Sequence, residues 1–121
     1  MSMTIEEMIK KKQEYFAAGK TYELAQRIQA LNRLEQGILN CEQELYAALK
    51  KDLGKSRAES YMCEVGLTLS ELRFVKKHVQ KWSREKRVPT PLAQFHARSF
   101  TVQEPYGVVL VMSPWNYPVL L

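Results

Sequence analysis

The residues best suited to form a site lie near the end of the sequence, in the run Ser113-Pro114-Trp115-Asn116-Tyr117-Pro118. Pro114 and Pro118 fix φ and lack a backbone donor, so the chain must run here as a stiff loop. The loop presents one side-chain amide and two aromatic rings. This combination is suited to binding a small ligand.

The residues before this loop predict its position in a sheet. Val108–Met112 is a short, unbroken apolar run rich in β-branched residues, and Pro105-Tyr106-Gly107 precedes it. Such a run is typical of an internal, usually parallel strand buried on both faces. Ligands of open α/β sheets bind at the carboxyl ends of strands, which is where this loop would begin.

Each residue of the loop also has a purely structural interpretation. Asn116 could form an Asx turn ahead of Tyr117-Pro118, and by itself that would be the favoured interpretation. Trp115 could be a core residue whose indole N–H is satisfied nearby. Tyr117 could be a packing residue.

The longer run EPYGVVLVMSPWNYP, residues 104–118, resembles the aldehyde dehydrogenase superfamily and is most similar to its class 3-like members. In that family a Pro-x-Gly-Val-Val strand leads into a Trp-Asn-Tyr/Phe-Pro loop. The run KKDLGK, residues 50–55, also fits the family's amino-terminal region. The resemblance implies an α/β parent fold and the oxidation of aldehydes to carboxylic acids through a cysteine thiohemiacetal. It further implies NAD or NADP as cofactor and a homo-oligomer.

The resemblance also implies roles for the loop residues. The side-chain amide of Asn116 would donate to the oxyanion formed when a cysteine thiolate attacks the aldehyde, since a preorganised neutral donor stabilises that charge. Tyr117 would line the aldehyde tunnel. The residues expected against the nicotinamide side of the cofactor are Met112, Ser113, Pro114 and Trp115.

The family's catalytic cysteine, general-base glutamate and glycine-containing cofactor turn would all lie beyond Leu121. We therefore expect an amino-terminal fragment of an aldehyde dehydrogenase, inactive alone and without bound cofactor. The identity of the aldehyde and the choice between NAD and NADP depend on residues outside this stretch. The alternative is a non-catalytic helical protein-interaction module.

Upstream of the loop, capping residues and apolar spacing predict helices. Thr4 and Glu7 form a capping box for the first, and Gly19 is a natural end. Thr21 is expected to cap a second helix. Gly37 and Asn40 interrupt the apolar pattern of that helix.

Asn40 is further expected, with Gln43, to cap a third helix, which Gly54 ends. Ser56 and Glu59 then cap a fourth helix, the longest, whose apolar residues extend to Trp82.

These patterns divide the chain into three regions. Residues 1–88 form a helical region, which must end before Pro89. Residues 89–107 form a β extension with an edge hairpin, which the resemblance implies is used for oligomer contacts. Residues 108–121 hold the first strand and active-site loop of an incomplete Rossmann-like cofactor domain. The part of the parent fold that these residues represent is thus expected to be mostly α-helical.

The remaining composition argues against several other functions. The net charge is +5, but the lysines are dispersed among acidic residues, so we expect no nucleic-acid partner. Cys41 and Cys63 have no metal-ligand spacing with His78 or His96, so we predict no metal site. Their contexts, Leu-Asn-Cys-Glu and Met-Cys-Glu, do not match the nucleophile segment of the resembling family, so we expect inert thiols. With no apolar run long enough to span a membrane and no signal sequence, we predict a cytoplasmic protein.

Overall fold

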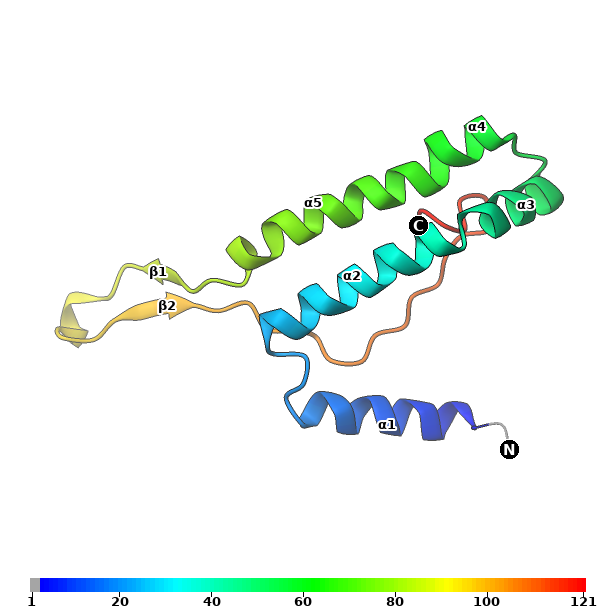
Figure 1. Ribbon diagram of the computed structural model, residues 1–121. Helices are drawn as coiled ribbons and strands as arrows, with labels where there is room; N and C mark the ends of the chain where they lie inside the picture. Colours follow the sequence, from blue (N-terminus) through cyan, green and yellow to red (C-terminus); the bar gives the residue numbers. More distant parts are fainter. Residues whose placement is uncertain (1–2) are drawn as a thin grey trace.

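The computed structural model describes residues 3–121, and most of the ordered elements are helices (Figure 1). In chain order the elements are α1 (Ile5–Ala17), α2 (Leu24–Asn40), α3 (Glu42–Leu53), α4 (Arg57–Ser60), the π-helical turn η1 (Tyr61–Val65), α5 (Gly66–Trp82), β1 (Lys86–Val88), the 3-10 turn η2 (Leu92–Gln94) and β2 (Ser99–Thr101). No helix of residues 3–121 is long and apolar enough to cross a bilayer.

The predicted start of the first helix is confirmed. Thr4 Oγ1 accepts from the backbone N–H of Glu7 at 3.2 Å, and the Glu7 carboxylate accepts from the backbone N–H of Thr4 at 2.9 Å. Gly19 and Gly54 adopt positive φ, 74° and 68°, at the ends of α1 and α3, where a side chain would be strained.

Two predicted caps are wrong. Thr21 does not cap α2, because a turn after Gly19 delays the helix until after Glu23, which makes no side-chain cap. Asn40 does not cap α3, because its Oδ1 accepts instead from Gln36 one turn earlier, at 2.9 Å. The second helix also continues through Gly37, since glycine in a helix costs only about 1 kcal/mol.

The predicted long helix from Ser56 to Trp82 is present, with a π turn inside it. The Ser56 hydroxyl accepts from the backbone N–H of Glu59 at 3.2 Å, and helical residues run unbroken through α4, η1 and α5. At the π turn the N–H of Gly66 donates to the carbonyl of Tyr61. A Cβ on Gly66 would lie 2.7 Å from that carbonyl oxygen, so the close approach requires glycine.

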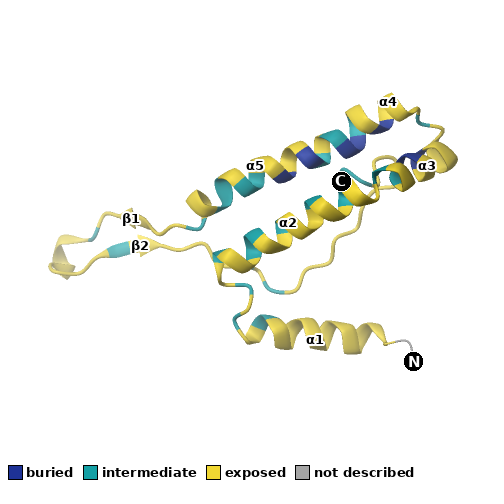
Figure 2. Cartoon of the chain, in the orientation of Figure 1, coloured by how far each residue is buried: buried dark blue, intermediate teal, exposed yellow. Residues whose placement is uncertain are grey.

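The buried residues concentrate where α3, η1 and the start of α5 meet (Figure 2). Tyr46, Val65 and Leu69 form the centre of this core, and Val119 from the end of the chain packs against it. The Tyr46 hydroxyl donates to Glu42 at 2.5 Å. Burial, together with this hydrogen bond, raises the pKa of Tyr46 to about 12.

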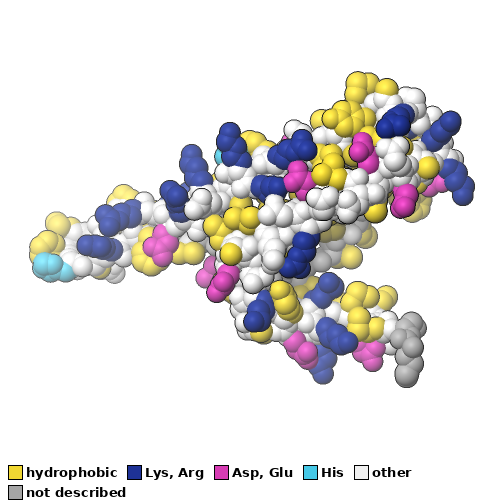
Figure 3. Space-filling model, in the orientation of Figure 1, with side chains coloured by type: hydrophobic (Ala, Val, Ile, Leu, Met, Phe, Trp, Pro, Cys, Tyr) yellow, Lys and Arg dark blue, Asp and Glu magenta, His cyan; other side chains and the backbone are white. Residues whose placement is uncertain are grey.

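Helix α2 lies beside α5 for much of its length (Figure 1). Glu35 on α2 joins the two helices, because its carboxylate accepts from Arg73 at 2.9 Å and from Lys76 at 2.5 Å. These two cations lower the pKa of Glu35. Elsewhere, lysine and arginine side chains are spread over the visible surface with acidic residues among them (Figure 3).

The predicted edge hairpin is present as the antiparallel pair β1–β2, which extends beyond the helices (Figure 1). Arg87 is paired with Phe100 in its register. Its first strand, Lys86–Val88, falls in the stretch that the sequence placed with the helices. The helix ends at Trp82, which leaves room for this strand before Pro89.

The strand predicted over Val108–Met112 is not formed, and this is a correction to the sequence interpretation. Within residues 3–121 the only sheet is the β1–β2 hairpin, so residues 108–112 have no neighbouring strand to pair with. They are also not buried on two faces, since Leu110 and Met112 are 82% and 83% exposed. A segment with a strand pattern needs at least one neighbouring strand to pair with before it becomes a strand.

Candidate functional site

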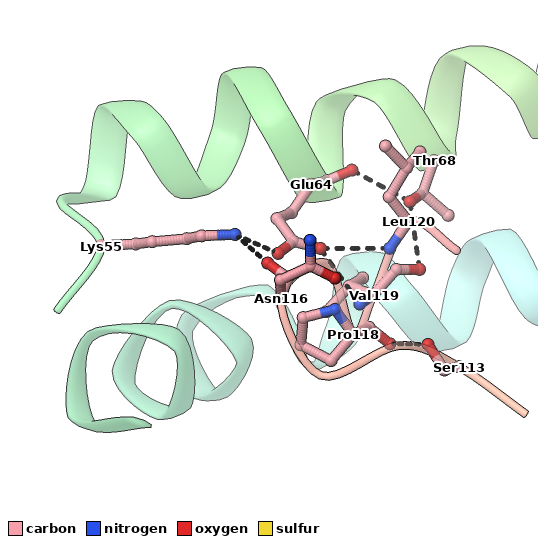
Figure 4. Close-up of polar contacts among 8 residues, drawn as sticks. All are labelled: Lys55, Glu64, Thr68, Ser113, Asn116, Pro118, Val119 and Leu120. Carbon is pink, nitrogen blue, oxygen red and sulfur yellow. Dashed lines mark hydrogen bonds and ion pairs between the residues drawn. The ribbon is translucent and has the colours of Figure 1, made fainter. Parts of the chain in front are cut away.

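The end of the chain returns to the helices and turns over residues 115–120, beside η1 and α3 (Figures 1 and 4). The turn is closed from within. Leu121 N–H donates to the Tyr117 carbonyl at 3.2 Å, and the Ser113 hydroxyl donates to the carbonyls of Pro118, at 3.0 Å, and Leu121. We call residues 113–121 the Asn116 loop.

Glu64 connects the π turn to the Asn116 loop. Its side chain is 0% exposed, and its Oε2 accepts from the backbone N–H groups of Val119 and Leu120 at 3.0 and 3.1 Å (Figure 4). A π turn adds one residue to the helical turn, which allows neighbouring Glu64 and Val65 both to face inward. The helix thus directs a carboxylate at the loop backbone.

Lys55 supplies the positive charge beside this carboxylate. Its ammonium lies 2.6 Å from Glu64 Oε1 and donates to the backbone carbonyl of Asn116 at 2.8 Å (Figure 4). It also lies 4.2 Å from the ring centroid of Tyr117, a cation–π distance. The hydrogen bond to Glu64 raises the pKa of Lys55, which keeps the ammonium charged.

Thr68 makes a further contact between helix and loop. Its hydroxyl lies 2.9 Å from the Glu64 carbonyl and 3.3 Å from the Val119 carbonyl (Figure 4). Pro118 and Val119 also border a cavity of about 500 Å³ against α3, whose lining includes Leu45, Leu49 and Trp115. The loop therefore has polar contacts with the long helix, and through Val119 it has apolar contacts with the core that contains Tyr46 of α3.

The structure brings the sequence-predicted site residues together in one exposed segment. Asn116 is exposed, and within residues 3–121 its side-chain amide makes no hydrogen bond, so it does not act as an Asx-turn former here. Met112 and Trp115 are 83% and 91% exposed, so Trp115 is not a core residue of this part of the chain. Tyr117 is 37% exposed and lies over Lys55.

Sequence reasoning missed Lys55 and Glu64 as contacts of this loop. One signal was available for Glu64, because it lies three residues after Tyr61 and four before Thr68, beside the apolar stripe of the long helix. A carboxylate at such a position needs a buried partner. Nothing in the pattern indicated that the partners would be backbone amides more than fifty positions away.

Chemically, the loop holds a neutral amide on a backbone whose position is fixed from two sides. A cation holds the carbonyl of Asn116, and an anion holds the N–H groups of Val119 and Leu120. The Asn116 amide itself is left free to donate. Stabilisation of a developing oxyanion requires a preorganised neutral donor, and here the backbone that carries the amide is held in place.

Comparisons with known proteins agree with the resemblance in the sequence. The family model described as "Aldehyde dehydrogenase family" matches residues 1–121. The chain is 35% identical over 117 residues to the 4,4'-diaponeurosporen-aldehyde dehydrogenase of Staphylococcus aureus, and 40% identical over 106 residues to aldehyde dehydrogenase family 3 member H1 of Arabidopsis thaliana. These alignments cover 97% and 88% of this chain but 26% and 22% of the relatives.

A solved structure, "Substrate bound state of Staphylococcus Aureus AldH", also matches the chain. The TM-score is 0.89 at 35% identity, with 97% of this chain and 26% of that one covered. The predicted fold class is thereby confirmed: a mostly helical portion of the parent fold with an edge hairpin. This chain spans about a quarter of the length of the relatives it matches.

Proposed function

The chain belongs to the aldehyde dehydrogenase family, and on that premise we propose that it forms the amino-terminal part of an NAD(P)-dependent enzyme that oxidises aldehydes to carboxylic acids. The observation that carries this proposal is the match of the family model to the whole chain, Asn116 loop included. The relatives reported above are named as aldehyde dehydrogenases, which favours an enzyme over a non-catalytic helical interaction module.

In this proposal a cysteine thiolate outside residues 1–121 attacks the aldehyde carbon to give a thiohemiacetal. The carbonyl oxygen then becomes negatively charged, and the Asn116 amide donates a hydrogen bond to it. Bound NAD(P)⁺ would supply the hydride acceptor, with its nicotinamide side against Met112, Ser113, Pro114 and Trp115, and water would then release the carboxylic acid. A neutral amide suits this role, because a lysine amine at the same place could itself attack the aldehyde.

The remaining loop residues form the proposed surroundings of the reacting atoms. The exposed side chains of Met112 and Trp115 fit the apolar face of a nicotinamide ring, with Ser113 and Pro114 between them. Tyr117 is proposed on the aldehyde side. The residues present therefore fit one wall of a cofactor site, while the choice between NAD and NADP and the identity of the aldehyde depend on the rest of the enzyme.

The other expectations from the sequence stay predictions: a homo-oligomer that uses the β1–β2 hairpin, and a cytoplasmic location. The two cysteines of the chain are free, Cys41 exposed and Cys63 half-buried. Neither is proposed as the nucleophile, because Leu-Asn-Cys-Glu and Met-Cys-Glu differ from the family's nucleophile segment.

The experiment is an assay of aldehyde-dependent reduction of NAD⁺ and NADP⁺, with a panel of aliphatic and aromatic aldehydes. We expect activity from the full-length polypeptide that carries this chain, and none from residues 1–121 alone. Absence of activity in the folded full-length protein with every aldehyde would contradict the proposal. Activity in residues 1–121 that is lost in Cys41→Ser or Cys63→Ser would contradict the assignment of the nucleophile.

A further inference from the structure

Among residues 3–121, Glu64 is the only charged residue that is fully buried. A buried carboxylate is strongly unfavourable unless it is paired and hydrogen-bonded. Here one oxygen accepts from Lys55 at 2.6 Å, and the other accepts from the N–H groups of Val119 and Leu120 at 3.0 and 3.1 Å. Most of what compensates Glu64 therefore comes from the Asn116 loop and from Lys55.

Lys55 completes the arrangement on the other side of the loop. Its ammonium reaches both the Glu64 carboxylate and the Asn116 carbonyl, which lies 2.8 Å away. The same two side chains thus hold the backbone at Asn116 and three to four residues later. Neither of them contacts the Asn116 side-chain amide through a hydrogen bond in this part of the chain. The backbone is fixed, and the amide remains available.

From this geometry we propose that Lys55 and Glu64 are positioning residues for the oxidation of the aldehyde, which hold the Asn116 loop so that the Asn116 amide points at the developing oxyanion. This inference rests on the proposed function, because it assumes that Asn116 is the oxyanion donor. The π turn belongs to the arrangement, since it places Glu64 inside the helix–loop contact. Displacement of a donor by about 1 Å can lower a rate on the order of 10²-fold.

A test must separate positioning from general stability. Glu64→Gln keeps the size of the side chain but has only one oxygen, so it cannot accept from both Lys55 and the two backbone N–H groups. Lys55→Met removes the ammonium and keeps an unbranched stem. Lys55→Arg restores a positive charge and donors. The matched control is Glu35→Gln. It removes a different carboxylate, which pairs with Arg73 and Lys76 and joins α2 to α5.

The experiment measures kcat, the KM for NAD(P)⁺ and the backbone hydrogen exchange of residues 113–121 in the full-length enzyme. For Glu64→Gln and Lys55→Met we expect kcat to fall on the order of 10- to 10²-fold, with little change in the KM of the cofactor. Exchange at Val119 and Leu120 should become faster in both variants. Lys55→Arg should recover most of the lost kcat, and Glu35→Gln should change neither kcat nor the exchange of these amides.

A double-mutant cycle with Asn116→Ala decides whether the pair acts through Asn116. If it does, Glu64→Gln or Lys55→Met should cost little further kcat once the Asn116 amide is gone, because the effects of coupled residues are not additive. Additive losses would overturn the proposal. Unchanged kcat in folded Glu64→Gln and Lys55→Met would overturn it as well.

Failure of this inference can be told apart from failure of the proposed function. Full kcat in Asn116→Ala would contradict the oxyanion role itself. A large loss in Asn116→Ala together with wild-type kcat in Lys55→Met would contradict only the positioning role. If Glu64→Gln does not fold, the test rests on the loss of kcat in Lys55→Met and on the smaller loss in Lys55→Arg. Lys55 is suited to this because it lies at the edge of the contact, with 11% of its side chain exposed.

Discussion

Glu64 Oε2 accepts a hydrogen bond from the backbone N–H of Val119 at 3.0 Å, although 55 positions separate the two residues in the sequence. This contact joins the long helix to the loop that carries the proposed oxyanion donor. It accounts for a fully buried carboxylate in a small core. The helical region therefore supports the Asn116 loop, although the hairpin separates the two in the sequence.

Gly66 gives the first prediction, because it lies at the π turn that directs Glu64 inward. Gly66→Ala should destabilise the protein by roughly 1 to 3 kcal/mol, since its Cβ would meet the Tyr61 carbonyl oxygen at 2.7 Å and the turn would have to shift. Urea unfolding of the variant and of wild type measures the effect.

Gly37→Ala is the control for that prediction. A Cβ at Gly37, inside α2, meets nothing within 4 Å, so the variant should gain about 0.5 to 1 kcal/mol from helix propensity. A stability of Gly66→Ala equal to or above wild type would show that the π turn does not need glycine.

A second prediction concerns Tyr46 at alkaline pH. Burial and the hydrogen bond to Glu42 raise its pKa to about 12, whereas an unfolded tyrosine titrates near 10. Between these values the folded state holds a proton that the unfolded state has lost. The contribution is therefore fully present below about pH 10 and is lost as the pH rises toward 12.

Tyr46→Phe should flatten the decline of the free energy of unfolding over about pH 10 to 12, the interval between the unfolded and the folded pKa of Tyr46. Lysines also titrate in this range, so the informative quantity is the difference in slope between variant and wild type. Tyr106→Phe is the control, because the Tyr106 side chain is fully exposed. Equal slopes in wild type and Tyr46→Phe would contradict the role of burial.

A third prediction concerns the exposed apolar segment of the isolated chain. Leu110, Val111, Met112 and Trp115 are 79% to 91% exposed, and residues 108–112 have backbone groups with no strand beside them. Such a segment favours pairing with another copy. We expect residues 1–121 to self-associate in light scattering, and Leu110→Lys with Val111→Lys to weaken that association.

Leu34→Lys is the control for self-association, because Leu34 is also an exposed apolar residue, at 52%, but belongs to α2 and to neither the hairpin nor residues 108–121. It should leave the apparent mass nearly unchanged. A monomer in which the amides of residues 108–121 are protected from exchange would contradict this prediction.

The helices could largely be predicted from the sequence because their signals are local. The Thr4–Glu7 capping box, the ends at Gly19 and Gly54 and the cap at Ser56 each depend on residues within one turn. The two wrong caps also have local causes. A turn after Gly19 moves the start of α2 past Thr21, and the side chain of Asn40 accepts a hydrogen bond from Gln36 instead of capping α3.

The strand at 108–112 and the support of the loop could not be predicted in this way, because both depend on distant residues. Val108–Met112 has the composition of a strand, but pairing requires neighbours that residues 3–121 do not provide. The contacts of Glu64 with Val119 and Leu120 follow from how the chain end returns to the long helix, which no periodic pattern encodes.

The oxyanion role of Asn116 is best tested by the rate of hydride transfer in the full-length enzyme with Asn116→Ala, measured in a single turnover so that chemistry limits the signal. We expect this rate to fall on the order of 10²- to 10³-fold, the usual cost of one oxyanion donor, with cofactor affinity nearly unchanged. Asn32→Ala, at an exposed position of α2, serves as the control and should keep the wild-type rate. A wild-type rate of hydride transfer in Asn116→Ala would contradict the oxyanion role, and with it the purpose assigned to Lys55 and Glu64.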